Sequence, residues 1–162
     1  MTDARFEEAP IADRPLRLKA EGSEDLSVIS SLVQDAVGRA SDVAWMRRKR
    51  RLVFVLNRFR WEDAEAARSE GRPFERVRSA LAIDGVTAVR ARGIQPGAGE
   101  KVLAILSLGF EDTEDGAGRV LVTCADDIAF AIEAEMLDVS LGDLTQPWQA
   151  KAAKAPDHGD QE

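Results

Sequence analysis

Arginine and lysine are the residues whose types and spacing could do chemistry in this chain. Five cations follow one another at Arg47, Arg48, Lys49, Arg50 and Arg51. Six more arginines stand in pairs at alternate positions of three later segments: Arg58, Arg60, Arg76, Arg78, Arg90 and Arg92. A guanidinium group is planar and can bind a carboxylate or a phosphate through two parallel hydrogen bonds. These residues therefore predict a surface that holds an anionic partner.

The distribution of charge narrows the class of partner. The chain has 22 basic and 29 acidic residues and a net charge of −7, yet residues 43–61 contain seven of the basic residues and no acid. Long-range repulsion from the acidic remainder opposes non-specific binding to a phosphate polymer. We therefore expect an acidic protein surface, or another anionic ligand met locally, and nucleic acid is the less favoured partner.

Two other interpretations of these cations stay open. The run at 47–51 also suits a solvated turn that charge keeps soluble. The arginines at alternate positions could be neutralised within the chain by acids such as Glu62, Asp63, Glu65 and Glu75. Because acids outnumber bases in this sequence, internal neutralisation is favoured for the second group.

Residues for catalysis or metal binding are sparse. His158 is the only histidine and Cys124 the only cysteine, so there is no pair for nucleophilic catalysis and no zinc set. Asp126 and Asp127 suit the first turn of a helix, where carboxylates favour the helix dipole. The acidic stretch at 111–115 lacks the ligand spacing of a calcium loop. We expect a protein that is not an enzyme, with no catalytic residue, metal or cofactor.

Length and composition indicate one folded domain. Residues 1–14 and 148–162 are polar, charged and broken by proline, which predicts two flexible tails around a domain at 15–147. No apolar run is long enough to span a bilayer, and the first residues contain no signal-peptide core. These features predict a cytoplasmic protein.

The first half of the domain is predicted to contain a strand, a helix and the basic hairpin. Residues 16–20 alternate as a strand, and residues 24–37 have apolar positions at helical spacing, with Gly38 as the stop. Residues 43–61 read as a β-hairpin with the five cations at its tip. Along its second strand one face is apolar throughout and the other changes from apolar to cationic: the faces are Val53, Val55, Phe59, Trp61 and Phe54, Leu56, Arg58, Arg60.

The second half is predicted to complete the sheet and end in a helix. Residues 62–73 read as a loop or short helical turn, and strands at 75–83 and 86–94 form a hairpin around Asp84-Gly85. Its preferred register places two arginine pairs opposite each other, Arg78 with Arg90 and Arg76 with Arg92. In a meander, Arg58 and Arg60 lie on the neighbouring strand and complete an arginine face.

Strands buried on both sides are expected at 102–110 and 120–124, followed by a second helix from Asp126 that buries Ile128, Ile132 and Met136. The predicted class is α+β: a curved, mostly antiparallel sheet of six or seven strands with one N-terminal and one C-terminal helix. This order of elements is similar to the pleckstrin-homology-like architecture.

One resemblance to a known family rests on three stretches. They are Ala44-Trp45 with the basic tip, the string Leu-Asn-Arg-Phe-Arg-Trp-Glu at 56–62, and the helix at 26–36. Over about residues 16–144 the chain resembles DUF2948, an uncharacterised alphaproteobacterial family with a domain of unknown function. The resemblance implies a cytoplasmic bacterial protein and supplies no activity and no site residues.

Two functions are compatible with these observations. The preferred one is a non-enzymatic binding or scaffold module that uses the arginine face and the basic hairpin tip to hold an anionic partner. The alternative is a structural protein that forms homo-oligomers, in which the basic hairpin of one copy meets the acidic surface of another.

Overall fold

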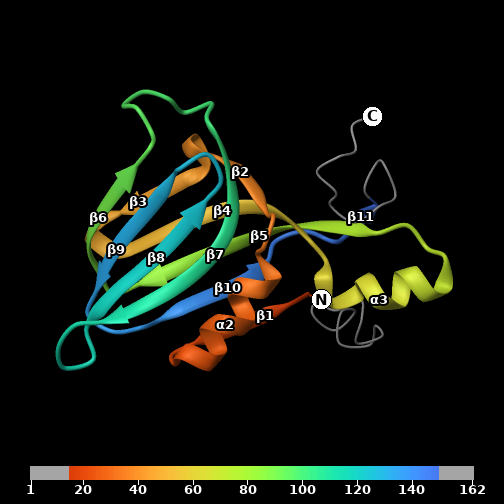
Figure 1. Ribbon diagram of the computed structural model, residues 1–162, viewed down its shortest axis with the longest axis horizontal. Coiled ribbons are helices and arrows are strands. Elements are labelled where there is room, and N and C mark those ends of the chain that lie inside the picture. The colour runs from red at the N-terminus through yellow and green to blue at the C-terminus, as the bar shows by residue number, and fades with distance from the viewer. Residues whose placement is uncertain (1–14, 150–162) are drawn as a thin grey trace.

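The structure, a computed structural model, describes residues 15–149 and consists of one strongly curved antiparallel sheet with two helices (Figure 1). The α+β class is confirmed, but the sheet has eleven strands rather than six or seven. In chain order the described elements are β1 (Arg17–Ala20), α2 (Ser23–Leu32), β2 (Val37–Arg39), the 3-10 turn η2 (Ala40–Asp42), β3 (Val43–Met46), the 3-10 turn η3 (Arg47–Lys49), β4 (Arg51–Phe59), α3 (Trp61–Glu70), β5 (Glu75–Asp84), β6 (Val86–Arg92), β7 (Val102–Asp112), β8 (Gly118–Cys124), β9 (Ala129–Ala134), β10 (Val139–Asp143) and β11 (Trp148–Gln149).

The sheet consists of two halves joined by a short central strand. Its order is β1-β10-β5-β4-β2-β7-β8-β9-β6, with β3 paired to β4 and β11 paired to β5. The close passage of β2 beside β4 requires Gly38, because a Cβ there would lie 2.7 Å from the Val55 carbonyl oxygen. The prediction that Gly38 ends the first helix is therefore wrong, since α2 ends at Leu32 and Gly38 lies in a strand.

The core fills the concave side of the curved sheet. Leu52, Phe54 and Leu56 of β4 are buried, while Val53 and Val55 on the other face are only half-buried. The face that changes from apolar to cationic is thus the one that points inward. Helix α2 buries Leu26 and Ile29 and packs against β7, β1 and β10 (Figure 1).

The predicted C-terminal helix is wrong, because its residues form a hairpin of β8 and β9. Asp126 and Asp127 have φ values of 64° and 61°, a left-handed pair that suits a two-residue hairpin loop and not the start of a helix. Burial then alternates along β9, where Phe130, Ile132 and Ala134 are buried. The pleckstrin-homology-like comparison depended on that helix and is not confirmed.

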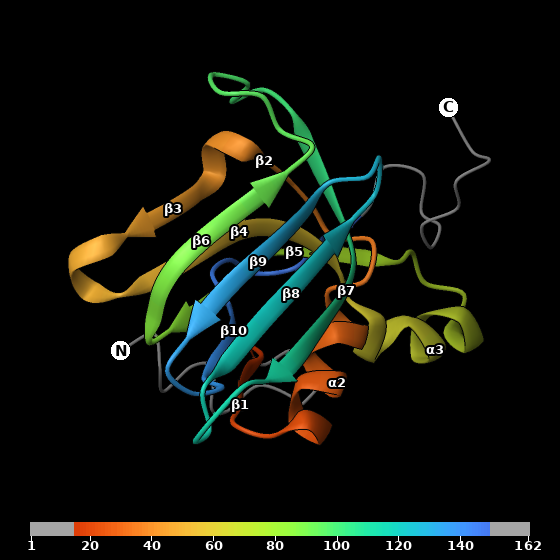
Figure 2. The ribbon, with the colours of Figure 1, turned by 60° about the vertical axis from the view of Figure 1, so that its left-hand side comes forward.

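The predicted hairpin of residues 75–94 is also wrong. The chain turns at Gly85, which has a φ of 73°, but β5 pairs with β4 and β10 while β6 crosses to the other half and pairs with β9. The Val86 amide donates to the Arg50 carbonyl at 2.9 Å, so the start of β6 lies beside the tip of the β3–β4 hairpin (Figure 2). Arg76 and Arg78 therefore do not lie opposite Arg92 and Arg90.

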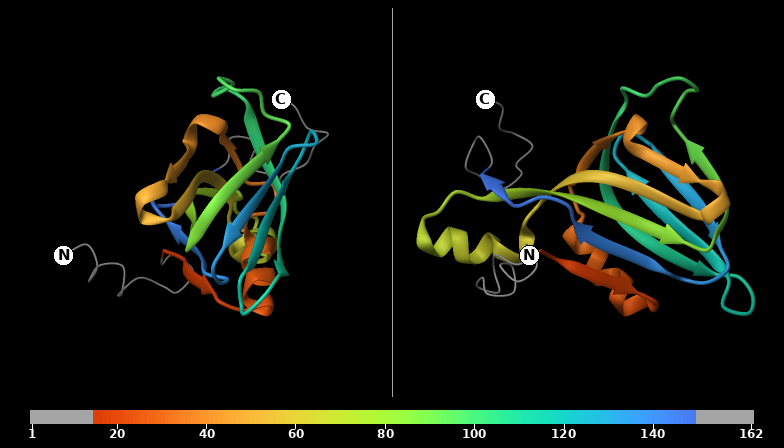
Figure 3. Two further views of the ribbon diagram at one scale, coloured as in Figure 1. Left: turned by 90° about the vertical axis from the view of Figure 1, so that its left-hand side faces the viewer. Right: turned by 180° about the vertical axis from the view of Figure 1, so that it is seen from behind.

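Other differences concern the ends of the domain and its two central strands. Residues 61–70 form a full helix, α3, which projects from the curved sheet together with β11 and the first part of β5 (Figure 3). Trp148 and Gln149, expected to belong to a flexible tail, pair with β5. Strands β7 and β8 are buried on one face only.

Residues 1–14 and 150–162, predicted to form flexible tails and including His158, lie outside the described residues. Neither α2 nor α3 has the length and apolar character that a membrane-spanning helix needs.

The β8–β9 turn can be distinguished from a helix by the sign of the stability difference between two variants at position 127. With a left-handed residue at 127, Asp127→Gly should be more stable than Asp127→Ala by about 1 kcal/mol, because glycine accepts positive φ without strain. A helix at this place would reverse the order, since alanine is favoured over glycine there by about 1 kcal/mol. Urea unfolding of both variants measures the difference. The same two substitutions at Asp112, a strand residue, are the control.

Candidate functional site

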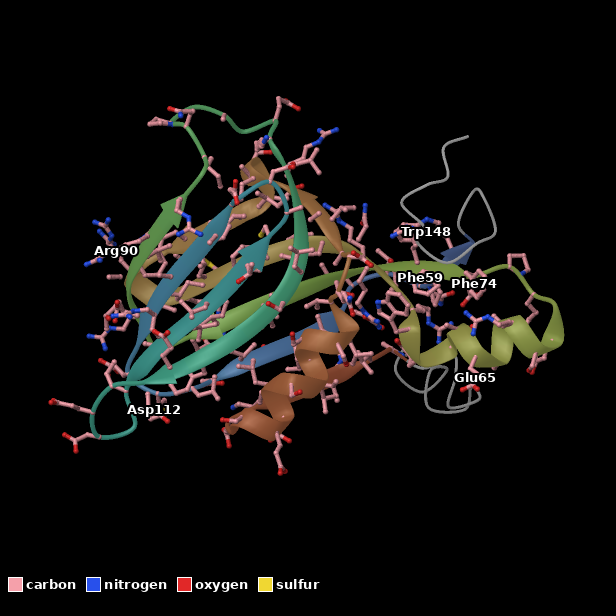
Figure 4. All side chains as sticks on the ribbon, in the orientation of Figure 1. Phe59, Glu65, Phe74, Arg90, Asp112 and Trp148 are labelled. Carbon is pink, nitrogen blue, oxygen red and sulfur yellow. The ribbon has the colours of Figure 1, made fainter. Side chains whose placement is uncertain are left out.

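The predicted arginine face does not exist as one surface, because the structure divides its residues between two environments. Arg58 and Arg60 are buried at 0% and 3% exposure, where α3 begins. Arg90 and Arg92 are exposed on β6, at the other side of the molecule (Figure 4).

Arg58 is enclosed by two carboxylates and a hydroxyl group. Its Nη1 and Nη2 donate to the two Glu62 oxygens at 2.9 and 2.7 Å, and Nη2 also lies 3.2 and 3.3 Å from the two Asp143 oxygens. Its Nε lies 3.1 Å from Ser79 Oγ, and that hydroxyl donates to Asp143 Oδ1 at 2.7 Å. Asp143 Oδ2 accepts a hydrogen bond from the Leu16 amide at 2.8 Å. This network connects β4, β5, β10, α3 and the chain just before β1.

The protonation of the network follows from these contacts. Burial by itself would lower the pKa of Arg58, but the hydrogen bonds and charges of Glu62 and Asp143 outweigh it and raise that pKa. Burial would likewise raise the pKa of Glu62, and Arg58 instead holds it below the ordinary value. Arg58 therefore stays charged and occupied, which makes it a structural group rather than a binding group.

Arg60 and Asp63 belong to a second set of ion pairs at the same end of the sheet. Arg60 is paired with Glu75, and its Nη1 lies 3.7 Å from Asp63 Oδ2. Arg72 binds both Asp63 oxygens at 3.0 and 3.2 Å. Internal neutralisation by Glu62, Asp63 and Glu75, the alternative left open by the sequence, thus applies to Arg58 and Arg60.

The two arginines of β5, Arg76 and Arg78, are half-buried and belong to neither of these groups. Arg78 donates to Asn57 Oδ1 at 3.2 Å. Arg76 is paired in the strand registers with Phe59 of β4 and with Trp148 of β11, two of the aromatic residues that Figure 4 labels. Glu65, another predicted neutralising acid, is exposed on α3 and has no ion pair among the described residues.

Of the five cations of the hairpin tip, two form ion pairs within the domain and three do not. Arg50, with a left-handed φ of 54°, binds Glu135 at 2.5 Å, and Arg51 binds Asp84 at 2.7 Å. These contacts hold the tip against the end of β5 and against the residue that follows β9. Arg47, Arg48 and Lys49 are exposed in η3 and have no ion pair or side-chain hydrogen bond within residues 15–149.

Arg90 and Arg92 form one wall of a shallow groove on the outer face of the sheet. They lie beside Ala131 and Ala129 of β9, the small side chains that floor the groove, and Leu121 and Thr123 of β8 line its other side. The volume of the groove is about 320 Å³. Neither arginine has an ion pair with a residue of the described chain, and Figure 4 shows Arg90 directed away from the sheet.

We call the exposed, unpaired cations on these two adjacent elements the basic edge: Arg47, Arg48, Lys49, Arg90 and Arg92. All five were predicted from the sequence as binding residues. Six further arginines predicted with them do not belong to the basic edge: Arg50, Arg51, Arg58, Arg60, Arg76 and Arg78. The groove floor was not predicted, because Ala129 and Ala131 were assigned to a helix. The alternation of Phe130 and Ile132 was the signal that could have identified a strand there.

The remaining candidates for chemistry are inert or dispersed. Burial raises the pKa of the Cys124 thiol to about 11, which keeps it protonated. Within the described range, no group of three or more His, Cys, Asp or Glu residues could hold a metal ion.

Comparison with known proteins gives one match. The model of a family described as "Protein of unknown function (DUF2948)" matches residues 16–158. No curated protein and no solved structure matches the chain.

The Arg58 network predicts a large difference between two identical substitutions. Asp143→Asn leaves a buried guanidinium short of one carboxylate and should lower the free energy of unfolding by about 3–5 kcal/mol. Asp84→Asn removes the partner of Arg51 at the surface and should lower it by at most about 1 kcal/mol. Urea unfolding measures both values, and equal losses would contradict a structural role for the network.

The lowered pKa of Glu62 predicts a dependence of stability on pH. A carboxylate whose folded pKa is lowered contributes stability above its unfolded pKa and loses it as pH falls through the folded value. The difference in unfolding free energy between wild type and Glu62→Gln should therefore be constant above the ordinary value of 4.5 and shrink below it. Glu65→Gln, on the exposed face of α3, is the control and should not show this change. A difference between wild type and Glu62→Gln that does not vary between neutral and acid pH would contradict the assignment.

Proposed function

Because the chain belongs to the DUF2948 family, which has no assigned activity, we propose its function from its own surface. It is a non-enzymatic binding module whose basic edge holds an acidic protein partner. The observation that carries this proposal is the contrast between the two arginine environments. The buried arginines Arg58 and Arg60 are paired with acids of the described chain, whereas the five exposed cations of η3 and β6 are not.

The overall charge of the chain supports a local and oriented interaction. With a net charge of −7, the molecule repels most anions at long range. A partner is attracted only where the basic edge faces it, so the charges act mainly on orientation and specificity.

The surroundings of the basic edge support a protein as the partner. The groove beside Arg90 and Arg92 has an apolar lining of alanine and leucine, so a ligand there would bury apolar atoms as well as a negative charge. Protein interfaces combine an apolar centre with a polar rim in this way. A phosphate polymer would gain from the five cations but would leave the alanine floor unused.

Titration with an acidic peptide tests the proposal. The probe is a fluorescein-labelled oligoglutamate of about ten residues, read by fluorescence anisotropy at low and high salt. Wild type should bind at low salt, and a variant with Arg47→Ser, Arg48→Ser and Lys49→Ser should bind about tenfold more weakly, with a smaller salt dependence.

A matched control removes three exposed cations elsewhere: Arg17→Ser, Lys19→Ser and Arg68→Ser, on β1 and α3. Its net charge equals that of the tip variant, and its affinity should stay close to wild type. Equal weakening in both variants would mean that net charge alone decides binding, and no binding by wild type would overturn the proposal. A dimer that dissociates in high salt, seen by light scattering, would favour a second copy as the partner.

A further inference from the structure

We propose that β6 captures its partner by strand addition: an extended peptide with alternating acidic and apolar residues pairs with the free edge of this strand. This inference rests on the proposed function and deepens it, because it states which backbone and which side-chain pattern the basic edge would recognise.

The free edge of β6 is the first reason. The strand stands at the end of the sheet and pairs with β9 on one side only. Its seven residues contain no proline, and Thr87, Ala88, Arg90, Ala91 and Arg92 are exposed. Within residues 15–149 no strand pairs with its other edge. Apart from the Val86 amide, which donates to the Arg50 carbonyl, that edge therefore presents unpaired amide and carbonyl groups, the template for an added strand.

Length distinguishes β6 from the other strands that pair on one side. Strands β1 and β3 have four residues each, and β11 has two. Two to four residues give few backbone hydrogen bonds to a docked peptide. The ladder of β6 has a register shift between Val86 and Ala88, and the five residues from Ala88 to Arg92 that follow it still match the usual length of a strand.

The side chains on the outer face of β6 determine which peptide side chains fit on the outer face of an added strand. Arg90 and Arg92 point outward in register with Ala131 and Ala129, and they are the only charged residues of β6. Residues directly across a ladder interact, and opposite charges stabilise the pairing. Every second residue of the peptide, on the outer face, should therefore be acidic.

The inner face requires a different side chain. Val89, the residue before Arg90, is partly buried against the core, as is Trp45 of the neighbouring β3 hairpin. Figures 1 and 2 both show β3 and β6 on the same side of the molecule. A residue of an added strand that points inward would meet these apolar side chains, so the residues between the acids should be apolar.

The same charges argue against a second copy as the added strand. If two β6 strands paired antiparallel in one continuous sheet, Arg90 and Arg92 of both copies would lie on the same face. Like charges across a ladder are unfavourable. The arginine pair therefore rejects self-pairing and cationic strands while it accepts an acidic strand, which is how specificity is obtained by repulsion as well as attraction.

The test compares peptides of identical composition. The probe is a fluorescein-labelled peptide of about ten residues that alternates glutamate and valine, and its isomer carries the glutamates in one block and the valines in another. The alternating peptide should bind at least about tenfold more tightly. Arg90→Ser with Arg92→Ser should abolish this preference, and Arg17→Ser with Arg68→Ser, a control of equal charge, should keep it.

Backbone methylation separates strand addition from simple charge attraction. In an extended strand the amides of alternate residues point to opposite edges. N-methylation of the glutamates in one peptide and of the valines in another should abolish binding in one of the two and spare the other.

Three outcomes would overturn the inference: equal affinity of the two isomers, tolerance of both methylation patterns, or unchanged preference in the β6 variant. In each of them, continued binding that depends on the tip cations would leave the proposed function standing. Absence of binding by every acidic peptide would overturn both.

Discussion

The burial of one guanidinium group, that of Arg58, is the constraint on which the arrangement of this domain depends. A charged group at 0% exposure is tolerated only when its donors are matched, and here two carboxylates, a hydroxyl and a carbonyl surround it. The matching groups come from different elements, Glu62 from α3 and Asp143 from β10. Satisfying Arg58 therefore fixes where α3 leaves the sheet and how β1 and β10 lie against β4 and β5.

This constraint also explains why arginines of one sequence pattern have two roles. On β4 the inward face runs from Leu52 and Phe54 to Arg58. The arginine therefore lies in the core, where Glu62 and Asp143 pair with it. On β6 the arginines alternate on the outward face, while Val89 points inward. No acid of the described chain pairs with Arg90 or Arg92. Arginine is thus a structural centre on β4 and, in the function we propose, a binding group on β6.

Several features of the fold could be predicted from the sequence, and others could not. The first strand, the first helix and the basic hairpin have local signals, and the structure contains all three. Glu62, four residues after Arg58, was among the acids expected to neutralise the arginines, and it is a partner of Arg58. The other two partners could not be predicted, because Asp143 is 85 residues away and Ser79 is 21. Asp84-Gly85 has the composition of a hairpin turn, yet the chain uses it to change from one half of the sheet to the other.

The alanines of β9 fit a helix as readily as a strand. The alternation of Phe130 and Ile132 favours a strand, and the left-handed φ values at Asp126 and Asp127, a backbone conformation that aspartate permits, form the turn that leads into it. The groove and the free edge of β6 both depend on that turn. The cations of the proposed binding surface could therefore be predicted from the sequence, but the surface itself could not.

The central claim is that Arg58 is occupied within the domain while Arg90 and Arg92 are free. Solvent exchange of the arginine Nε–H groups, followed by NMR before and after addition of the alternating peptide, tests it most directly. The account predicts slow exchange for Arg58 in both states, and fast exchange for Arg90 and Arg92 that slows when the peptide binds. Arg58 exchanging as fast as Arg90, or protection of Arg90 and Arg92 in the free protein, would contradict it.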